Sequence, residues 1–154
     1  MIELLKETNL TTKNFIAKAM DLRDFLTQQP GARLGNDACP LNHFFADGIY
    51  IREMIGLKGM VVVTKIHKTT HPYFVLKGDV SIYTEEGLVR IKAPYWGITK
   101  AGTIRVGYFH EDTVWITAHA TDKTDTDEIE EDLVAESYDA LPEYIKDTLR
   151  LEEV

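Results

Sequence analysis

The apolar positions of the chain follow two different periods. Near the start, four apolar residues recur at steps of four, three and four, which places them on one face of a helix. These residues are Phe15, Ala19, Leu22 and Leu26. The spacing predicts an amphipathic helix over residues 11–29, which a threonine can cap at its start and which the Pro30-Gly31 pair ends.

From residue 49 the pattern changes to short runs rich in Val, Ile, Tyr, Phe and Thr, with turn-forming residues between them. The runs predict eight strands, over residues 49–55, 60–67, 73–76, 79–83, 88–93, 95–99, 104–109 and 114–119. Short strands at this spacing are typical of an antiparallel sandwich or closed barrel rather than of a parallel α/β sheet. Residues 30–48, before these strands, are rich in turn formers and predict an irregular segment.

The last part of the chain returns to a helical pattern. Residues 127–141 predict an acidic amphipathic helix, because Asp127 and Glu130 have capping-box spacing and an apolar stripe accompanies them. Pro142 interrupts this helix, and residues 144–151 predict one or two further helical turns. We therefore expect a single domain over residues 1–154. Its parts would be an N-terminal helix at 11–29, a barrel at 45–120 and a C-terminal helical segment at 126–151.

The net charge of −8 is unevenly distributed. Residues 122–154 hold 13 acidic and 3 basic residues, whereas residues 1–121 hold 12 acidic and 14 basic residues. The body of the protein is therefore slightly basic, which permits an anionic ligand there. No block of lysine and arginine predicts nucleic-acid binding.

Other patterns narrow the class of protein further. No run of about 18 apolar residues predicts a membrane span, and the first residues lack the basic and apolar regions of a signal peptide. The only cysteine, Cys39, cannot form an internal disulfide, so a reducing compartment and a cytoplasmic location are expected. The sequence also lacks the GxSxG, Walker, HExxH and GxGxxG motifs of several common enzyme classes.

The stretch from residue 59 to residue 78 holds the candidate chemistry. Strand alternation places Lys65 and His67 on one face, and after a short bend His71 and Tyr73 form another alternating set. Two histidines four residues apart at the mouth of a barrel could share a metal ion, since neutral imidazole suits Zn, Fe, Ni or Cu.

These residues resemble the cupin superfamily. Its first motif has two histidines flanking one residue, then a glutamate, then a glycine with six residues between these last two. His71 and Gly78 have that spacing, so His71 takes the place of the glutamate, while His67 and Lys65 take the places of the histidines. A second motif matches residues 100–105, with Arg105 in the place of its histidine. The resemblance covers about residues 45–120.

The resemblance implies an all-β core of the cupin type. This is a double-stranded β-helix, or jelly-roll barrel, here with an N-terminal helix and an acidic C-terminal helix. Residues 48–53, 67–71 and 102–107 look most like those of small single-domain cupin-like proteins from bacteriophage and bacterial genomes. Such a likeness implies the fold better than the reaction, because cupins include oxygenases, isomerases, epimerases and pure binders. If the protein is phage-encoded, the host cytoplasm is its expected location.

The departures from the motif favour binding of an anionic small molecule. Lys65 and Arg105 stand where metal ligands would be, and a cation there repels a metal ion. If the cupin register holds, both point into the barrel, where their partner is an internal carboxylate such as Glu53 or an anionic ligand. The expected ligand is a nucleotide, a sugar phosphate or a carboxylate, and phage-encoded ligand sequestration is one use. The expected ligand-binding residues are Arg52, Lys65, His67, His71, Tyr73 and Arg105.

Two enzymatic hypotheses stay open. In the first, a metal-dependent oxygenase or isomerase uses His67 and His71, with His119 as a third ligand from the last strand. The cofactor that it requires is one divalent transition metal, Fe, Mn, Ni or Zn. In the second, a metal-free epimerase or isomerase uses a histidine as general base. Under any of these hypotheses a homo-oligomer, a dimer or larger, is expected, since eight short strands leave edges that need a partner.

Overall fold

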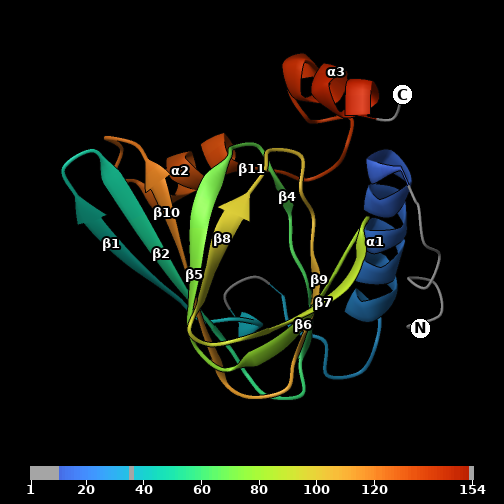
Figure 1. Cartoon of the computed structure of the whole chain (residues 1–154), viewed down its shortest axis with the longest axis vertical. Coiled ribbons are helices and arrows are strands. Elements are labelled where there is room, and N and C mark those ends of the chain that lie inside the picture. Colours follow the sequence, from blue (N-terminus) through green and yellow to red (C-terminus); the bar gives the residue numbers. More distant parts are fainter. Residues whose placement is uncertain (1–10, 35–36, 153–154) are drawn as a thin grey trace.

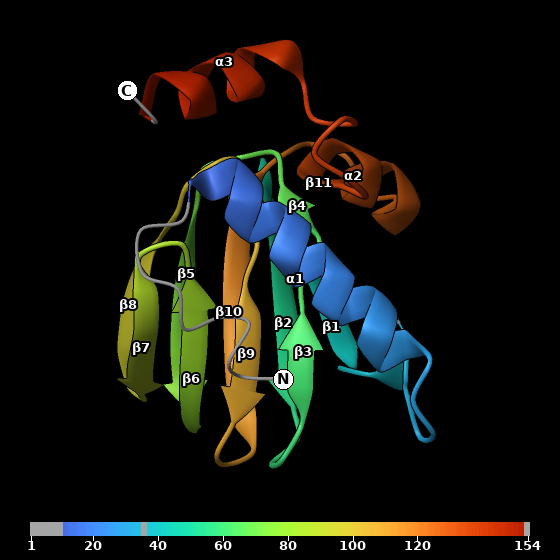
Figure 2. The same ribbon diagram turned by 90° about the vertical axis from the view of Figure 1, so that its right-hand side faces the viewer.

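The computed structural model describes residues 11–34 and 37–152 of the chain, and its first element is the predicted N-terminal helix. Helix α1 (Thr12–Thr27) is capped by the Thr11 hydroxyl, which accepts a hydrogen bond from the Asn14 N–H. Phe15 and Ala19 on its apolar face are almost completely buried. They pack in one core cluster with Ile104 and Val106, so the helix lies against one side of the barrel (Figure 2).

Two antiparallel sheets form the body. The five-stranded sheet has the order β1 (Leu41–Ala46), β2 (Ile49–Gly56), β10 (Thr113–Ala120), β5 (His71–Lys77) and β8 (Tyr95–Thr99). The four-stranded sheet has the order β3 (Val61–Val63), β9 (Val106–Phe109), β6 (Asp79–Thr84) and β7 (Gly87–Lys92). A short third pair joins β4 (Ile66–His67) to β11 (Val134–Ala135).

The strand pairing is that of a jelly roll. β2 pairs with β10, β3 with β9, β5 with β8 and β6 with β7, so that strands far apart in sequence pair from the outside inward. Side chains of both sheets meet in one apolar cluster, which includes Val75 and Trp115 from the first sheet and Val80 and Phe109 from the second. The sheets therefore enclose a common interior (Figure 1), and the predicted jelly-roll core is confirmed.

Strand β1 corrects the prediction that residues 30–48 are irregular. It pairs with β2 from Leu41 opposite Met54 to Ala46 opposite Ile49. The two-residue Asp47-Gly48 turn joins the two strands, and Gly48 has a φ of 70°. A tight hairpin turn needs that left-handed conformation, which glycine adopts without strain.

The single strand expected over residues 60–67 is interrupted, and we call this interruption the break. The structure has β3 and β4 instead, with Thr64 and Lys65 between them in neither strand. There the Thr64 N–H donates to the carbonyl of Arg105, and the Thr64 hydroxyl accepts from the Arg105 N–H. The break resets the alternation, so Thr64 and His67 both face the interior while Lys65 turns outward.

The acidic helix is shorter than expected. Helix α2 (Thr126–Leu133) ends at Leu133, where residues 127–141 were predicted to be helical throughout. The chain becomes extended at Val134 because β11 pairs there with β4. Ile129 and Leu133 pack against Tyr50, so α2 covers one end of its own barrel (Figure 1).

Helix α3 (Glu143–Glu152) follows directly after Pro142. Its residues Ile145 and Leu149 belong to the same core cluster as Phe15 and Ile16 of α1 and Ile104 of the barrel. None of the helices in the described ranges is long and apolar enough to cross a membrane.

The close approach of Gly56 to Phe109 gives a test of the packing. A methyl group at position 56 would overlap the Phe109 ring, which is 1% exposed. We expect Gly56→Ala to lower the free energy of unfolding by roughly 1–3 kcal/mol, as overpacking does in other cores. Urea denaturation measures the change. Gly59→Ala is the control, since it meets no neighbour within 4 Å and adds only backbone strain. A Gly56→Ala variant as stable as wild type would contradict this packing.

Candidate functional site

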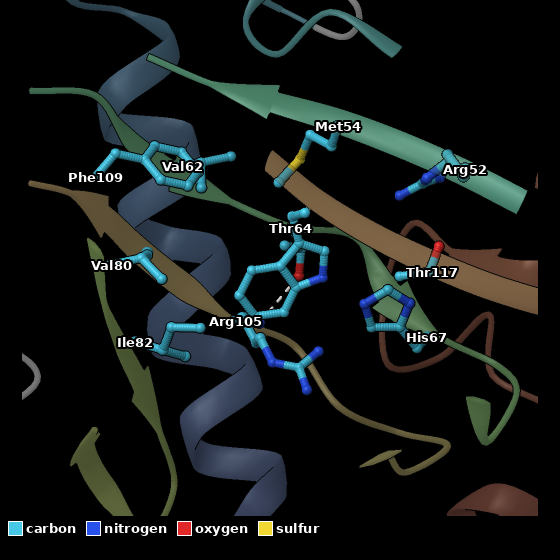
Figure 3. Close-up of a pocket in the computed structure, with 12 residues that line it drawn as sticks. Arg52, Met54, Val62, Thr64, His67, Val80, Ile82, Arg105, Phe109 and Thr117 are labelled. Atoms are coloured by element: carbon cyan, nitrogen blue, oxygen red, sulfur yellow. Dashed lines mark hydrogen bonds between the residues drawn. The ribbon is translucent and has the colours of Figure 1, made fainter. Parts of the chain in front are cut away.

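An internal cavity of about 50 Å³ lies between the two sheets. Twelve residues from both sheets and from the break after β3 line it (Figure 3). They are Arg52, Met54, Val62, Thr64, His67, Val80, Ile82, Arg105, Gly107, Phe109, Trp115 and Thr117. Three of these residues, Arg52, His67 and Arg105, were expected from the sequence to bind a ligand.

The cavity has an apolar and a polar end. Met54 pairs with Trp115 across β2 and β10, and Arg52 pairs with Thr117 one inward position further along. Figure 3 shows Met54 and Phe109 toward one side, and Arg52 and His67 toward the other. The alternation of β2 thus turns a methionine and an arginine toward the same interior but at different depths.

Arg105 is held against an aromatic wall. Its guanidinium carbon lies 5.0 Å from the centre of the Tyr73 ring and 5.8 Å from that of Trp115. These two rings stack with their centroids 4.6 Å apart. The guanidinium also donates a hydrogen bond of 2.9 Å to the Thr99 hydroxyl. Burial lowers the pKa of Arg105, with Tyr73 and Glu85 opposing the shift, but an arginine keeps its charge at neutral pH.

Arg52 has no acidic partner in the described part of the chain. Its side chain forms no hydrogen bond or ion pair with residues 11–34 or 37–152. Glu53, next to it in sequence, points to the opposite side of the sheet and accepts a hydrogen bond of 2.8 Å from Asn42. None of the described residues lining the cavity is acidic. The expectation that Glu53 neutralises the internal cations is therefore wrong.

Three buried histidines lie beside the polar end. The ring centroids of His67 and His71 are 4.9 Å apart, and those of His71 and His119 are 4.3 Å apart. The structure thus brings His119 of β10 together with the two histidines of the motif, as the sequence suggested. His71 Nδ1 donates to the Thr69 carbonyl, and His119 Nε2 is hydrogen-bonded to the Thr117 hydroxyl.

The second nitrogen of two of these rings is buried without a partner. They are Nε2 of His71 and Nδ1 of His119. Because Nδ1 of His71 carries its proton toward a carbonyl, its Nε2 is a free acceptor in the neutral ring. A buried polar atom without a partner costs about 1–3 kcal/mol, so these atoms mark a place that stability alone does not explain.

The histidines are neutral at pH 7. Burial, followed by the charge of neighbouring groups, lowers the pKa of His67 well below its ordinary value of 6.5. Burial and the nearby arginines lower the pKa of His71 to about 4. Burial, His71 and Arg52 lower that of His119 to about 3. The positive charge at the cavity therefore belongs to Arg52 and Arg105.

These residues do not fit a transition metal. Among the residues that the structure describes, no group of three or more His, Cys, Asp or Glu side chains is arranged to hold a metal ion. His67, like His71 and His119, has a ring nitrogen without a described hydrogen bond, but the three rings are not arranged around one position that could hold an ion. The arginine charges that disfavour the protonated histidines also oppose a metal cation. The metal site predicted at His67, His71 and His119 stays a prediction.

The structure separates the residues that the sequence predicted to bind a ligand. Arg52, His67 and Arg105 line the cavity, while Tyr73 supports Arg105 from the side. Lys65 does not point into the barrel. Its ammonium pairs with Glu130 at 2.7 Å and Glu136 at 2.8 Å, outside the barrel beside α2. That expectation was wrong because it extended strand alternation across the break at Thr64 and Lys65.

Sequence reasoning missed Thr64 as a lining residue and gave no role to Met54 or Thr117. A signal was present for two of them. Met54 lies two residues after Arg52, and Thr117 lies two before His119, so alternation places each on the same face as a predicted site residue. No such signal existed for Thr64, whose inward position depends on the break.

The depressed histidine pKa values predict acid sensitivity. A ring with a pKa of about 4 in the folded state and 6.5 when unfolded binds more protons unfolded between these values. Stability is therefore full above pH 6.5 and falls as the pH drops toward 4, by roughly 3 kcal/mol for His71 alone. Urea denaturation across pH 4–7 measures this slope. We expect a shallower slope in a His71→Gln, His119→Gln double variant, and an unchanged slope would contradict the assignment.

Comparison with known proteins gives distant structural likenesses only. No protein-family model and no curated protein sequence matches the chain. Among solved structures, it is similar to an RmlC-like cupin from Shewanella frigidimarina, with 11% identity, 61% of this chain and 85% of that chain covered, and a TM-score of 0.49. It is also similar to the cupin domain of an XRE-family transcriptional regulator from Enterobacter cloacae, with 7% identity, coverage of 56% and 99%, and a TM-score of 0.47.

A third similar structure is an acetylacetone dioxygenase from Acinetobacter johnsonii. It has 13% identity, covers 61% of this chain and 75% of its own, and has a TM-score of 0.44. Likenesses this weak concern the fold alone and say nothing about ligand or reaction.

Proposed function

We propose that the protein binds a small anionic molecule inside its barrel, with Arg52 and Arg105 as the charge-recognising groups. The observation that carries this proposal is the presence of two arginines on a cavity that has no acidic residue among its described lining. A buried cation is unfavourable unless it is paired, and here the described residues supply no acidic partner. Arginine is suited to a carboxylate or phosphate, which it can bind through two parallel hydrogen bonds.

The cavity size favours a small ligand over a nucleotide. A water molecule needs roughly 10–15 Å³ on this scale, so about 50 Å³ accommodates only a few water-sized groups. Pockets for larger organic ligands have volumes of roughly 300–1,000 Å³. Of the three ligand classes expected from the sequence, a short carboxylate fits this space better than a sugar phosphate or a nucleotide. Sequestration of a small acid is accordingly the use that we favour over sequestration of a nucleotide.

The polarity of the walls indicates what the rest of the ligand is like. Opposite the arginines, Met54, Val80 and Phe109 form an apolar end with no hydrogen-bonding side chain. A carboxylate held by Arg52 and Arg105 would direct its other end toward these side chains. The ligand that matches both ends is a short carboxylic acid with an aliphatic tail, such as butyrate or isobutyrate.

A second candidate function is a metal-free isomerase acting on such an acid. The neutral His67 lies on the cavity wall, where it could accept a proton from a bound ligand. The two arginines would stabilise the negative charge that develops when the proton leaves. Exchange of the ligand's α-hydrogens with deuterated water, measured by NMR with wild type and His67→Gln, distinguishes this function from binding alone.

Calorimetric titration with isobutyrate and with inorganic phosphate tests the binding proposal. We expect Arg105→Gln and Arg52→Gln each to weaken isobutyrate binding about ten- to a hundredfold, because each removes a charged hydrogen bond worth about 1.5–3 kcal/mol. Lys65→Gln is the matched control, since this cation lies outside the barrel and should leave affinity unchanged. Equal losses in all three variants, or no binding of either anion by wild type, would contradict the proposal.

Elemental analysis of protein purified without added metal or chelator tests the metal-dependent alternative. If Arg52 and Arg105 set the charge of the site, we expect less than one transition metal per ten chains. A stoichiometric metal that is lost in a His71→Ala, His119→Ala double variant would overturn this expectation. It would favour a metal-dependent oxygenase or isomerase instead.

A further inference from the structure

The outer surface of the five-stranded sheet is apolar and uncovered by the described residues. Inward positions of its strands hold Arg52, Tyr73 and Thr117, so the positions next to them point outward. Cross-strand pairing joins three large outward side chains in one row, Ile116 of β10, Phe74 of β5 and Trp96 of β8. We call the outward side chains of this sheet the outer sheet face.

None of the three described helices covers this face. α1 packs with Val61, Val63 and Val106, on the side of the four-stranded sheet. α2 packs on Tyr50, an inward residue of β2, at the end of the barrel. Figure 1 shows the same arrangement, with α1 on the side of the barrel away from β1, β2 and β10. Trp96 is 66% exposed and Phe74 is 37% exposed, although both belong to regular strands.

The exposed apolar area approaches what a stable interface requires. The large outward side chains that are exposed are Phe44, Ile49, Phe74, Leu76, Trp96 and Ile98. With roughly 200 Å² for a large side chain, their exposed parts amount to on the order of 600 Å². The largest apolar patch of an ordinary monomer is about 300–600 Å², and a standard interface buries about 800 Å² per partner.

Charge indicates which partner fits. The chain has a net charge of −8, so two copies repel each other over most of their surfaces. The row across the outer sheet face has one acidic member, Glu53, which pairs with Ile116 and accepts a hydrogen bond from Asn42. With one carboxylate per copy, this face is much less acidic than the chain as a whole, so two copies repel each other less here than elsewhere, and two sheets pack readily face to face at about 10 Å.

We infer that the outer sheet face binds the same face of a second copy, which makes a two-fold symmetric homodimer. Such a contact is self-complementary, because each copy presents the same residues. It would join two sheets, rather than extend one sheet through its edge strand. The cavities would stay separate, since Arg52 and Arg105 lie on the other side of the strands that form the interface.

Sedimentation velocity on the full chain tests this inference. We expect wild type at about 50 µM to sediment with twice the chain mass of 17.5 kDa. A Phe74→Glu, Trp96→Glu double variant should sediment as a monomer, with a dimer dissociation constant at least a hundredfold higher. The matched control is a Leu88→Glu, Val89→Glu double variant on β7, at side chains that are 57% and 47% exposed on the other sheet, and it should remain a dimer.

Circular dichroism shows whether each variant is folded, and Ile98→Lys is a milder second test at the same face. A monomeric wild type at 50 µM would overturn the inference. A dimer that survives in both the double variant and Ile98→Lys would also overturn it, and would indicate pairing through a strand edge. Dissociation of the β7 control to the same extent would show that added charge, not the outer sheet face, controls association.

Discussion

The site depends on keeping two guanidinium groups charged inside a barrel without an acidic partner. The charge of Arg105 is stabilised in part by a hydrogen bond to the Thr99 hydroxyl and by the faces of two stacked aromatic rings. Arg52 is left without a described partner. The cavity thus presents two cationic groups without a described anionic partner, which is the basis of the proposed anionic ligand.

The described acidic residues of the C-terminal segment lie outside the barrel and leave the cavity cationic. The acidic C-terminal segment contributes Glu130 and Glu136, which pair with Lys65 outside the barrel, and none of its carboxylates reaches the described cavity lining. The inside stays cationic while the outside is strongly anionic. The three histidines do not disturb this separation, because burial and their neighbours keep them uncharged at neutral pH.

Much of this fold could be predicted from periodicity. The structure differs from the prediction where segments distant in sequence interact. Asn42 and His43 interrupt the apolar pattern of β1, although the Asp47-Gly48 turn was a readable hairpin signal. The break at Thr64 could not be predicted, since its residues are good strand formers and the cause is hydrogen bonding to Arg105. Arg52, His67 and Arg105 could be placed at the cavity from alternation and the cupin resemblance. Lys65 could not, and the unpartnered nitrogens of His71 and His119 become visible only once the rings are packed.

The short pairing between β4 and β11 ties the end of the chain to the wall of the cavity. Val134 lies opposite His67, and the Lys68 N–H donates to the carbonyl of Leu133. The backbone that carries a cavity histidine is therefore also the docking strand for the C-terminal segment. Detaching that segment would therefore disturb the backbone at His67, and the proposed binding of a ligand in the cavity would be linked to attachment of the tail. The acidic C-terminal segment is therefore part of the structure that surrounds the cavity.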